Sequence, residues 1–202
     1  MRKTKDDAQI TRQTILNAAM NVFCKDGYAN ARLEDIAHGA GVTRGAVYHH
    51  FGGKPEVYTA LVNERFQEVN KFIKNITLQP GTPKELLRKL MTAMLEHLEN
   101  NREYRAIQEL VLFKTAYTPE LEEGMSYKIQ STKDTLYFIE KIMKEGVRSG
   151  EFKESLNTRS AALGFIGLIS GISSLWLLDN SLFSVKRQAQ TITDVFFGGI
   201  TA

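Results

Sequence analysis

The sequence contains very little cysteine. Cys24 is the only one among its 202 residues, so no disulfide can form within the chain. A thiol–metal cluster needs several cysteines, and we expect neither a metal site nor any other cofactor. A single free thiol is typical of a protein kept in a reducing cytosol, and we therefore expect a cytoplasmic location. Residues 1–10 are polar and charged, so we expect no signal peptide there.

Strand patterns and helix-interrupting prolines are also scarce. No stretch shows the sustained alternation of apolar and polar residues that marks a β-strand. A proline in the first turn of a helix sacrifices no hydrogen bond, and each proline here stands where a helix can begin. These positions are Pro55, Pro80, Pro83 and Pro119. We therefore predict an all-α protein with about nine helices.

The apolar periodicity and the glycine and proline breaks set the expected helices. They are predicted over residues 11–25, 32–39, 43–51, 55–76, 84–100, 103–116, 120–149, 158–179 and 186–198. Gly27 is expected to end the first helix. The first helix carries an apolar stripe of Ile15, Ala19, Val22 and Phe23. The second is expected to bury Leu33, Ile36 and Ala37.

Charge is unevenly distributed along the chain. The net charge is +3, and residues 1–54 hold 8 Lys and Arg against 5 acidic residues, while the remainder holds 18 of each sign. A basic excess confined to one end favours phosphate binding by a small domain. We place the boundary at Gly52-Gly53, which predicts a DNA-binding domain over residues 1–53 and a larger helical domain over residues 54–202.

Two short predicted helices and the turn between them are typical of a helix-turn-helix, whose second helix enters the major groove of DNA. Gly45 and Ala46 near the start of that helix let its backbone approach the bases closely. Thr43 is expected to cap the helix, and Arg44 to reach a guanine edge or a phosphate. The run is too polar and glycine-rich to be an ordinary core helix.

Further phosphate contacts are expected beside this helix. Tyr48, His49 and Lys54 lie further along the same side, where contacts to the DNA backbone fix the register. The N–H groups at the start of the next helix, around Lys54, offer another phosphate site. His50 is expected to point inward, because adjacent histidines do not share a helix face.

Residues 10–57 resemble the N-terminal domain of the TetR family of regulators. The resemblance rests on ILNAA (15–19), Phe23, Gly27-Tyr28, LEDIA (33–37), GVTRGAVYHHF (41–51) and Lys54. Within this family, residues 2–5 and 42–48 are most similar to the AcrR/TtgR group of multidrug-efflux repressors. Glu109-Leu110, Lys114 and residues 167–176 resemble that group more loosely.

The resemblance implies a three-helix helix-turn-helix domain followed by a helical domain that binds a ligand and dimerises. It implies a repressor that binds a pseudo-palindromic operator as a dimer, is released by a lipophilic small molecule, and controls a multidrug efflux system. We find no phosphate loop, metal-ligand spacing or nucleophile motif, and expect no enzymatic activity. The alternative is a DNA-binding protein of the same fold that acts through a protein partner without a small-molecule effector.

Two positions depart from the family pattern. Ala31-Arg32 stands where Ser or Thr usually opens the second helix. Asn30 is then a candidate cap, and Arg32 a candidate additional contact to a base or phosphate. His49 occupies a position that is often Trp in close efflux repressors, which predicts a weaker or pH-dependent phosphate contact. The operator sequence is therefore not transferable from the family.

Residues 160–178 contain no charged side chain. A charge-free run of this length is long enough to form a transmembrane helix. They also contain Gly167 and Gly171 at a small-xxx-small spacing, as well as four serines. We favour the centre of a dimeric four-helix bundle, because such a helix is covered on all sides. The last helix is expected to be its partner, through Ile192, Val195 and Phe196. We therefore expect a homodimer and no membrane association.

Gln108 and Glu109 lie within the apolar stretch 106–113. A buried carboxylate needs a partner, because burying it alone costs roughly several kcal/mol. Glu109 is therefore either paired with Arg105 or a polar anchor in an effector cavity, and the resemblance favours the cavity. The aromatic side chains expected to line that cavity are Phe66, Phe113, Phe138, Phe165 and Trp176.

Overall fold

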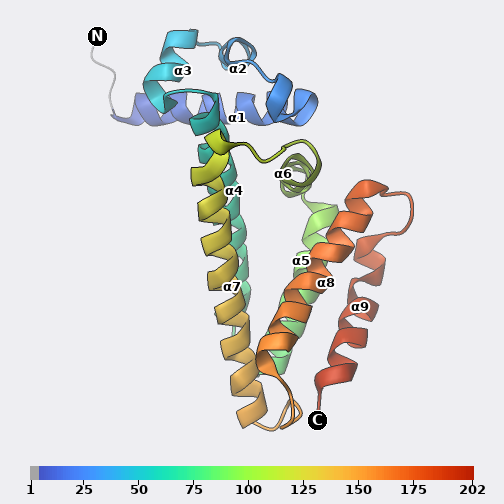
Figure 1. The fold of residues 1–202 in the computed structure, drawn as a ribbon. Helices are drawn as coiled ribbons and strands as arrows, with labels where there is room; N and C mark the ends of the chain where they lie inside the picture. The colour runs from blue at the N-terminus through green and yellow to red at the C-terminus, as the bar shows by residue number, and fades with distance from the viewer. Residues whose placement is uncertain (1–4) are drawn as a thin grey trace. The chain divides into compact units, whose positions relative to one another are not determined.

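The computed structural model describes residues 5–202, which form nine α-helices and one 3-10 helix (Figure 1). The helices are α1 (Lys5–Asn30), α2 (Leu33–Gly39), α3 (Arg44–Phe51), α4 (Lys54–Thr77), α5 (Pro83–Asn100), α6 (Arg102–Phe113), η1 (Pro119–Leu121), α7 (Glu122–Arg148), α8 (Thr158–Leu178) and α9 (Val185–Ile200). Over these residues β-structure is limited to one isolated bridge between Phe152 and Thr201. The all-α prediction is confirmed. Arg2 and Lys3, which add to the basic charge, lie outside the described residues.

The helix ends agree closely with the sequence pattern, with two informative differences. Helix α1 begins at Lys5 rather than at residue 11, and Asp6 and Asp7 occupy its first turn. Acidic side chains there are stabilised by the partial positive charge of the helix N-terminus. The helix predicted over 120–149 is divided into η1 and α7, because a tighter first turn precedes the α-helix.

The sequence predicts that Gly27 ends the first helix, whereas α1 is kinked at Gly27 and continues to Asn30. Its backbone has φ +74°, which is a left-handed conformation that residues with a Cβ rarely adopt. A Cβ at this position would also lie 3.2 Å from the carbonyl oxygen of Lys114. The chain continues from Tyr28, whose N–H donates to that same carbonyl at 3.0 Å. Gly27 therefore allows the close approach of the segment that follows α6.

Three of the four prolines begin helices. Pro55 lies in the first turn of α4, Pro83 is the first residue of α5, and Pro119 is the first residue of η1. The prediction for Pro80 is wrong, because α5 starts only after Thr82. Thr82 and Glu85 form a capping box, in which each side chain accepts a hydrogen bond from the other residue's backbone N–H. This cap fixes the helix start beyond Pro80.

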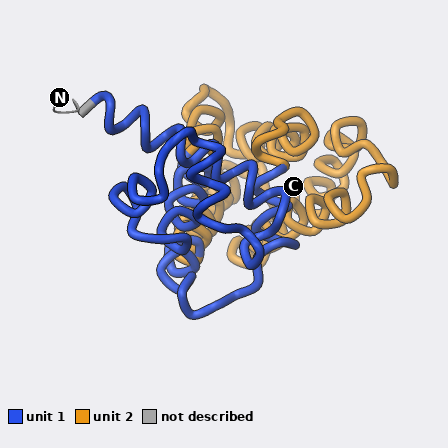
Figure 2. The backbone as a smooth tube through the Cα atoms, turned by 90° about the horizontal axis from the view of Figure 1, so that it is seen from above, with its two compact units in different colours: residues 1–67, 106–128 blue, residues 68–105, 129–202 orange. Residues whose placement is uncertain are grey.

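The chain divides into two compact units (Figure 2). Unit 1 comprises residues 1–67 and 106–128, and unit 2 comprises residues 68–105 and 129–202. Unit 1 contains α1, α2 and α3, and its core includes a three-ring cluster of Phe23, Tyr28 and Tyr58 with centroids 5.0–5.9 Å apart. The two units do not test the boundary predicted at residue 53 between the DNA-binding domain and the larger helical domain. That boundary stays a prediction.

Unit 2 is built on α5, which packs against both α8 and α9. The apolar side of α5 is buried through Leu87, Leu90, Met91, Leu95 and Leu98. Thr92 and the buried Thr193 of α9 share a hydrogen bond of 3.0 Å between their hydroxyls, so the polar atoms in this contact are satisfied. Phe165 of α8 meets Phe196 of α9 edge to face at 5.8 Å. The three helices therefore form a continuous core.

Helix α8 has an exposed apolar side. Leu163 and Leu175 are 54% and 53% exposed, although Phe165 and Trp176 of the same helix are buried. By length and composition α8 also meets the criteria for a membrane-crossing helix, and it is the one helix in residues 5–202 that does so. Among the described residues, α8 packs against α5 and α9, while Leu163, Leu175 and Leu178 stay more than half exposed.

Candidate nucleic-acid interface

Helices α2 and α3 form the predicted helix-turn-helix. The turn between them depends on Gly41, whose φ of +64° places it in the left-handed region. The N–H of Gly41 donates to the His38 carbonyl, and the N–H of Val42 donates to the Ala37 carbonyl, both at 3.0 Å. Helix α2 buries the three apolar residues expected of it, while α3 buries only Val47. Helix α3 therefore contributes only Val47 to the buried core, and the turn sets its position beside α2.

Thr43 caps α3, which confirms the sequence prediction. Its backbone is extended, and its hydroxyl oxygen accepts a hydrogen bond from the Ala46 N–H at 3.2 Å. A Thr cap satisfies one of the free N–H groups at the start of a helix and stabilises it by about 1 kcal/mol. The start of α3 is thereby held in one conformation.

The outward side of α3 is polar and small. Thr43, Arg44, Gly45, Tyr48 and His49 are all exposed, and Ala46 is half-buried. His50 is half-buried, as expected, beside the ring of Phe51. None of the exposed side chains is needed by the core, so this side of α3 is available to a partner.

Arg44 is held in an exposed polar cluster. Its guanidinium forms an ion pair with Glu34 of α2 at 2.5 Å and donates to the Tyr48 hydroxyl at 3.0 Å. It also lies over the Tyr48 ring, 5.3 Å from the centroid. The hydrogen bond to Tyr48 and the charge of Glu34 raise the pKa of Arg44, which stays protonated. Exposed ion pairs are weak, so a phosphate or base can replace Glu34 at little cost.

Lys54 has partners within unit 1. Its ammonium donates to the carbonyl oxygens of Tyr28 and Ala29, at 3.0 and 3.2 Å, and lies 4.6 Å from the Tyr28 ring centroid. These carbonyls follow the break at Gly27. An ammonium has three donors, so one N–H of Lys54 remains for the predicted phosphate contact.

Arg32 is the N-cap residue of α2, and its side chain makes no capping hydrogen bond. The suggestion that Asn30 supplies this cap is wrong. The Asn30 side-chain amide instead donates to the Asp26 carbonyl at 3.2 Å, because Asn30 still belongs to the last turn of α1. Arg32 itself is exposed, and its contact to DNA stays a prediction.

The side chains predicted to line an effector cavity are divided between the two units. Unit 1 holds Phe66, Gln108, Glu109 and Phe113, and unit 2 holds Phe138, Phe165 and Trp176. Phe113 and Phe138 are 48% and 37% exposed, whereas Phe165 and Trp176 are buried in unit 2. Their grouping around one ligand stays a prediction.

The partner expected for Glu109 is wrong. Glu109 pairs with Lys114 at 2.8 Å, and its side chain is 41% exposed rather than enclosed in the core. Arg105 instead lies over the indole ring of Trp176, 5.7 Å from its centroid. The helix ends at Phe113, so the chain leaves the helical path and brings Lys114 back to Glu109.

Two family models match the chain. Residues 15–61 match bacterial regulatory proteins of the tetR family, and residues 82–200 match the C-terminal region of the MAATS-type transcriptional repressors. The chain belongs to the TetR family of transcriptional regulators. The first match covers the helix-turn-helix of this TetR-family chain, and the second covers α5 to α9.

Relatives of this TetR-family chain include repressors of multidrug efflux pumps. The HTH-type transcriptional regulator AcrR of Shigella flexneri is 30% identical over 94% of this chain and 88% of its own. The structure of NalD, the secondary repressor of the MexAB-OprM multidrug efflux pump of Pseudomonas aeruginosa, has a TM-score of 0.83 at 27% identity, over 98% of both chains. A complex of triclosan with SmeT, the repressor of the Stenotrophomonas maltophilia efflux pump SmeDEF, has a TM-score of 0.82 at 28% identity, over 96% of this chain and 93% of that one.

Sequence reasoning missed two residues of this interface. Glu34 supplies the carboxylate that holds Arg44, and Tyr28 supplies both a carbonyl and a ring to Lys54. Tyr28 is also anchored by donating from its hydroxyl to Glu120 at 2.8 Å, and burial together with that bond raises its pKa. The sequence shows that Glu34 lies in the first turn of α2, where its charge is stabilised by the helix dipole. Its pairing with Arg44 depends on how α2 and α3 cross, which a sequence pattern does not specify.

Proposed function

We propose that this TetR-family repressor binds a pseudo-palindromic operator as a homodimer and is released by a lipophilic small molecule, and that it controls a multidrug efflux system. It acts in the cytoplasm by binding alone, without catalysis or a cofactor. The observation that carries the proposal is the exposed, capped start of α3, where small and polar side chains stand outside the core.

Direct readout of DNA is assigned to the first turns of α3. Gly45 and Ala46 admit the backbone to the major groove, and the guanidinium of Arg44 matches the paired acceptors on a guanine edge. Tyr48 and His49 contact phosphates from the same side, and Arg32 and Lys54 extend the basic surface. Glu34 keeps Arg44 extended before binding and releases it to the DNA, because their ion pair is exposed.

The exposed apolar side of α8 supports dimerisation. Leu163, Leu175 and Leu178 of α8 and Val195 of α9 are each more than half exposed in the single chain. Burying apolar surface contributes roughly 25 cal/mol per Å², so a second copy that covers this surface stabilises both chains. A two-fold pair of α3 helices then reads two half-sites about 34 Å apart.

Release by a lipophilic effector is supported by the relatives. SmeT binds triclosan, and NalD represses an efflux pump. An effector need only bind the conformation that does not bind DNA more tightly than the one that does. A coupling free energy of about 3 kcal/mol lowers operator affinity roughly 150-fold.

The decisive experiment is Arg44→Ala, assayed by fluorescence anisotropy on an operator selected from random DNA by the wild-type protein. Losing a bidentate base contact is expected to weaken operator binding about 10- to 100-fold and binding to random DNA much less. The matched control is Arg148→Ala, an exposed arginine at the end of α7, which should bind both DNAs like the wild type.

Two outcomes contradict separate parts of the proposal. If Arg44→Ala binds the operator as tightly as the wild type, α3 is not the reading helix. If triclosan and other lipophilic probes leave wild-type operator affinity unchanged, release by a small molecule is wrong, and the protein acts through a protein partner instead.

A further inference from the structure

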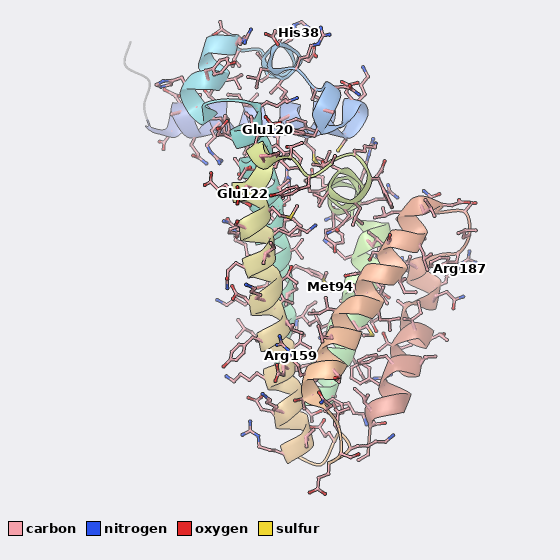
Figure 3. All side chains as sticks on the ribbon, in the orientation of Figure 1. His38, Met94, Glu120, Glu122, Arg159 and Arg187 are labelled. Atoms are coloured by element: carbon pink, nitrogen blue, oxygen red, sulfur yellow. The ribbon has the colours of Figure 1, made fainter. Side chains whose placement is uncertain are left out.

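The loop between α8 and α9 borders a hollow that lies entirely within unit 2. Its volume is about 500 Å³, and its walls come from the end of α5, the start of α6, the last turn of α8, the loop, and the first turn of α9. Arg187 of that first turn is labelled in Figure 3. Of the side chains predicted to bind an effector, only Trp176 borders this hollow.

The positive charge at the hollow comes from two arginines. Within residues 5–202, neither Arg105 nor Arg187 forms an ion pair. Arg187 is exposed, and Arg105 is half-buried with its guanidinium over the ring of Trp176. A guanidinium has five donors arranged for carboxylate or phosphate oxygens, so the two arginines together favour an anion.

The acidic residue that borders the hollow is already engaged. Glu99 accepts hydrogen bonds from the Ser184 hydroxyl at 3.0 Å and from the Lys186 N–H at 2.9 Å. The bond from Lys186 and that from Ser184 lower the pKa of Glu99, whose negative charge is stabilised at the N-terminus of α9. The Glu99 carboxylate of α5 therefore holds the start of α9 to the end of α5, and within residues 5–202 it forms no ion pair with Arg105 or Arg187.

Hydrogen bonds within the loop and at the start of α9 set the conformation of the loop. Asp179 accepts hydrogen bonds from the Ser181 N–H at 2.9 Å and from its hydroxyl at 2.7 Å. Ser184 caps α9 by accepting from the Arg187 N–H at 3.2 Å, which sets the direction in which the first turn begins. These bonds within the chain set the shape of the loop, so binding requires little reordering of it.

Apolar surface lies beside the two charges. Leu182 is 64% exposed, and the side chain of Phe183 is half-buried on the same loop. Trp176 is buried beneath the guanidinium of Arg105. We propose that this hollow binds an aromatic carboxylate, whose charged end meets Arg105 and Arg187 and whose ring lies against Leu182 and Phe183. This site goes beyond the proposed function, and it is occupied independently of DNA.

The test uses Trp176 as a reporter, since it is the only tryptophan in the chain. Titration of the full-length protein with 4-nitrobenzoate is expected to quench tryptophan fluorescence with a saturating curve. The neutral analogue 4-nitrobenzamide has the same ring without the charge. It is expected to need at least about tenfold more compound for the same quenching, because it lacks charge-assisted hydrogen bonds. Equal quenching by the two compounds overturns the proposal.

Variants locate the site. Arg187→Gln and Arg105→Gln are each expected to weaken 4-nitrobenzoate binding about tenfold, while Arg148→Gln, an exposed arginine of α7, leaves it unchanged. Circular dichroism checks that each variant is folded. The proposal is contradicted if both Arg187→Gln and Arg105→Gln bind 4-nitrobenzoate with wild-type affinity. It is also contradicted if Arg148→Gln loses as much affinity as they do. Because no DNA is present, the result stands even if small-molecule release from the operator fails.

Discussion

Helices α3 and α8 both expose a side that the core does not use, but the two sides differ in kind. The exposed side of α3 carries hydroxyl, guanidinium and imidazole groups around Gly45. The exposed side of α8 carries leucines, and the helix has no charge beyond Arg159 in its first turn. A surface of the first kind can stay hydrated until it meets DNA. A surface of the second kind is stabilised only when water is removed from it.

The largest expected effect follows from placing a charge on the exposed side of α8. Leu175→Asp would bury two carboxylates in a dimer interface, which costs roughly several kcal/mol. The dimer dissociation constant should rise at least about 100-fold in sedimentation-velocity experiments.

The control for this variant is Lys141→Asp on the exposed surface of α7, which should leave the dimer intact. Because Leu175 is 53% exposed in the single chain, the helical circular-dichroism signal should persist in both variants. A Leu175→Asp protein that still sediments as a dimer would remove α8 from the interface.

The next effect concerns the cap of α3. Thr43→Ala removes the acceptor for the Ala46 N–H, and should lower the free energy of unfolding by about 1 kcal/mol in urea denaturation. Operator affinity should fall about fivefold, because the first turn loses its fixed conformation. Thr43→Ser keeps the hydroxyl oxygen and should restore both quantities. Failure of Ser to rescue affinity would assign the methyl group, rather than the cap, to DNA contact.

Lys54 tests whether a basic residue with internal partners still contributes to DNA binding. Lys54→Gln should flatten the dependence of log K on log salt by about 0.9, the value for one phosphate contact. Tyr48→Phe carries no change of charge and should leave that slope unaltered. An unchanged slope in Lys54→Gln would restrict the ammonium to the carbonyls of Tyr28 and Ala29.

The smallest effect belongs to His97, which lies on neither exposed side. Its ring stacks on Phe72 at 4.4 Å and meets Tyr104 at 4.9 Å, and burial lowers its pKa below 6.5. The unfolded chain then binds the proton more readily than the folded one. Stability is therefore full above about pH 6.5 and declines as the pH falls toward the folded pKa. His97→Phe should lessen the fall in urea midpoint between pH 7.5 and 5.5, and an identical fall would contradict this.

The sequence predicted local features well. The helices, the break at Gly27 and the cap at Thr43 each depend on residues that are close together in the chain. A cap needs only its own residue and the N–H three positions later, so a short sequence pattern contains all the information.

Contacts between distant residues could not be predicted in this way. The predicted pair of Arg105 with Glu109 does not form, because the Arg105 guanidinium lies over the ring of the distant Trp176, and Lys114, just beyond the end of α6, pairs with Glu109 instead. The pairing of Glu34 with Arg44 depends on the crossing of two helices. The acceptors of Lys54 are carbonyls in the last turn of α1, 25 and 26 residues earlier in the chain, and the fold brings them to the start of α4. Each outcome depends on backbone geometry that residue types alone do not specify.

The segment after α6 is tied to the end of α1 by bonds in both directions. The Lys114 carbonyl accepts from the Tyr28 N–H, and the Lys114 ammonium donates to the Cys24 carbonyl at 2.6 Å. Lys54, at the start of α4, donates to the carbonyls of Tyr28 and Ala29 in the last turn of α1. The end of α6 therefore cannot slide along α1 without breaking these bonds or carrying the first turn of α4 with it. The Tyr28 N–H should exchange its hydrogen with solvent only when these bonds break. Its exchange rate therefore measures how often the end of α1, the end of α6 and the start of α4 separate.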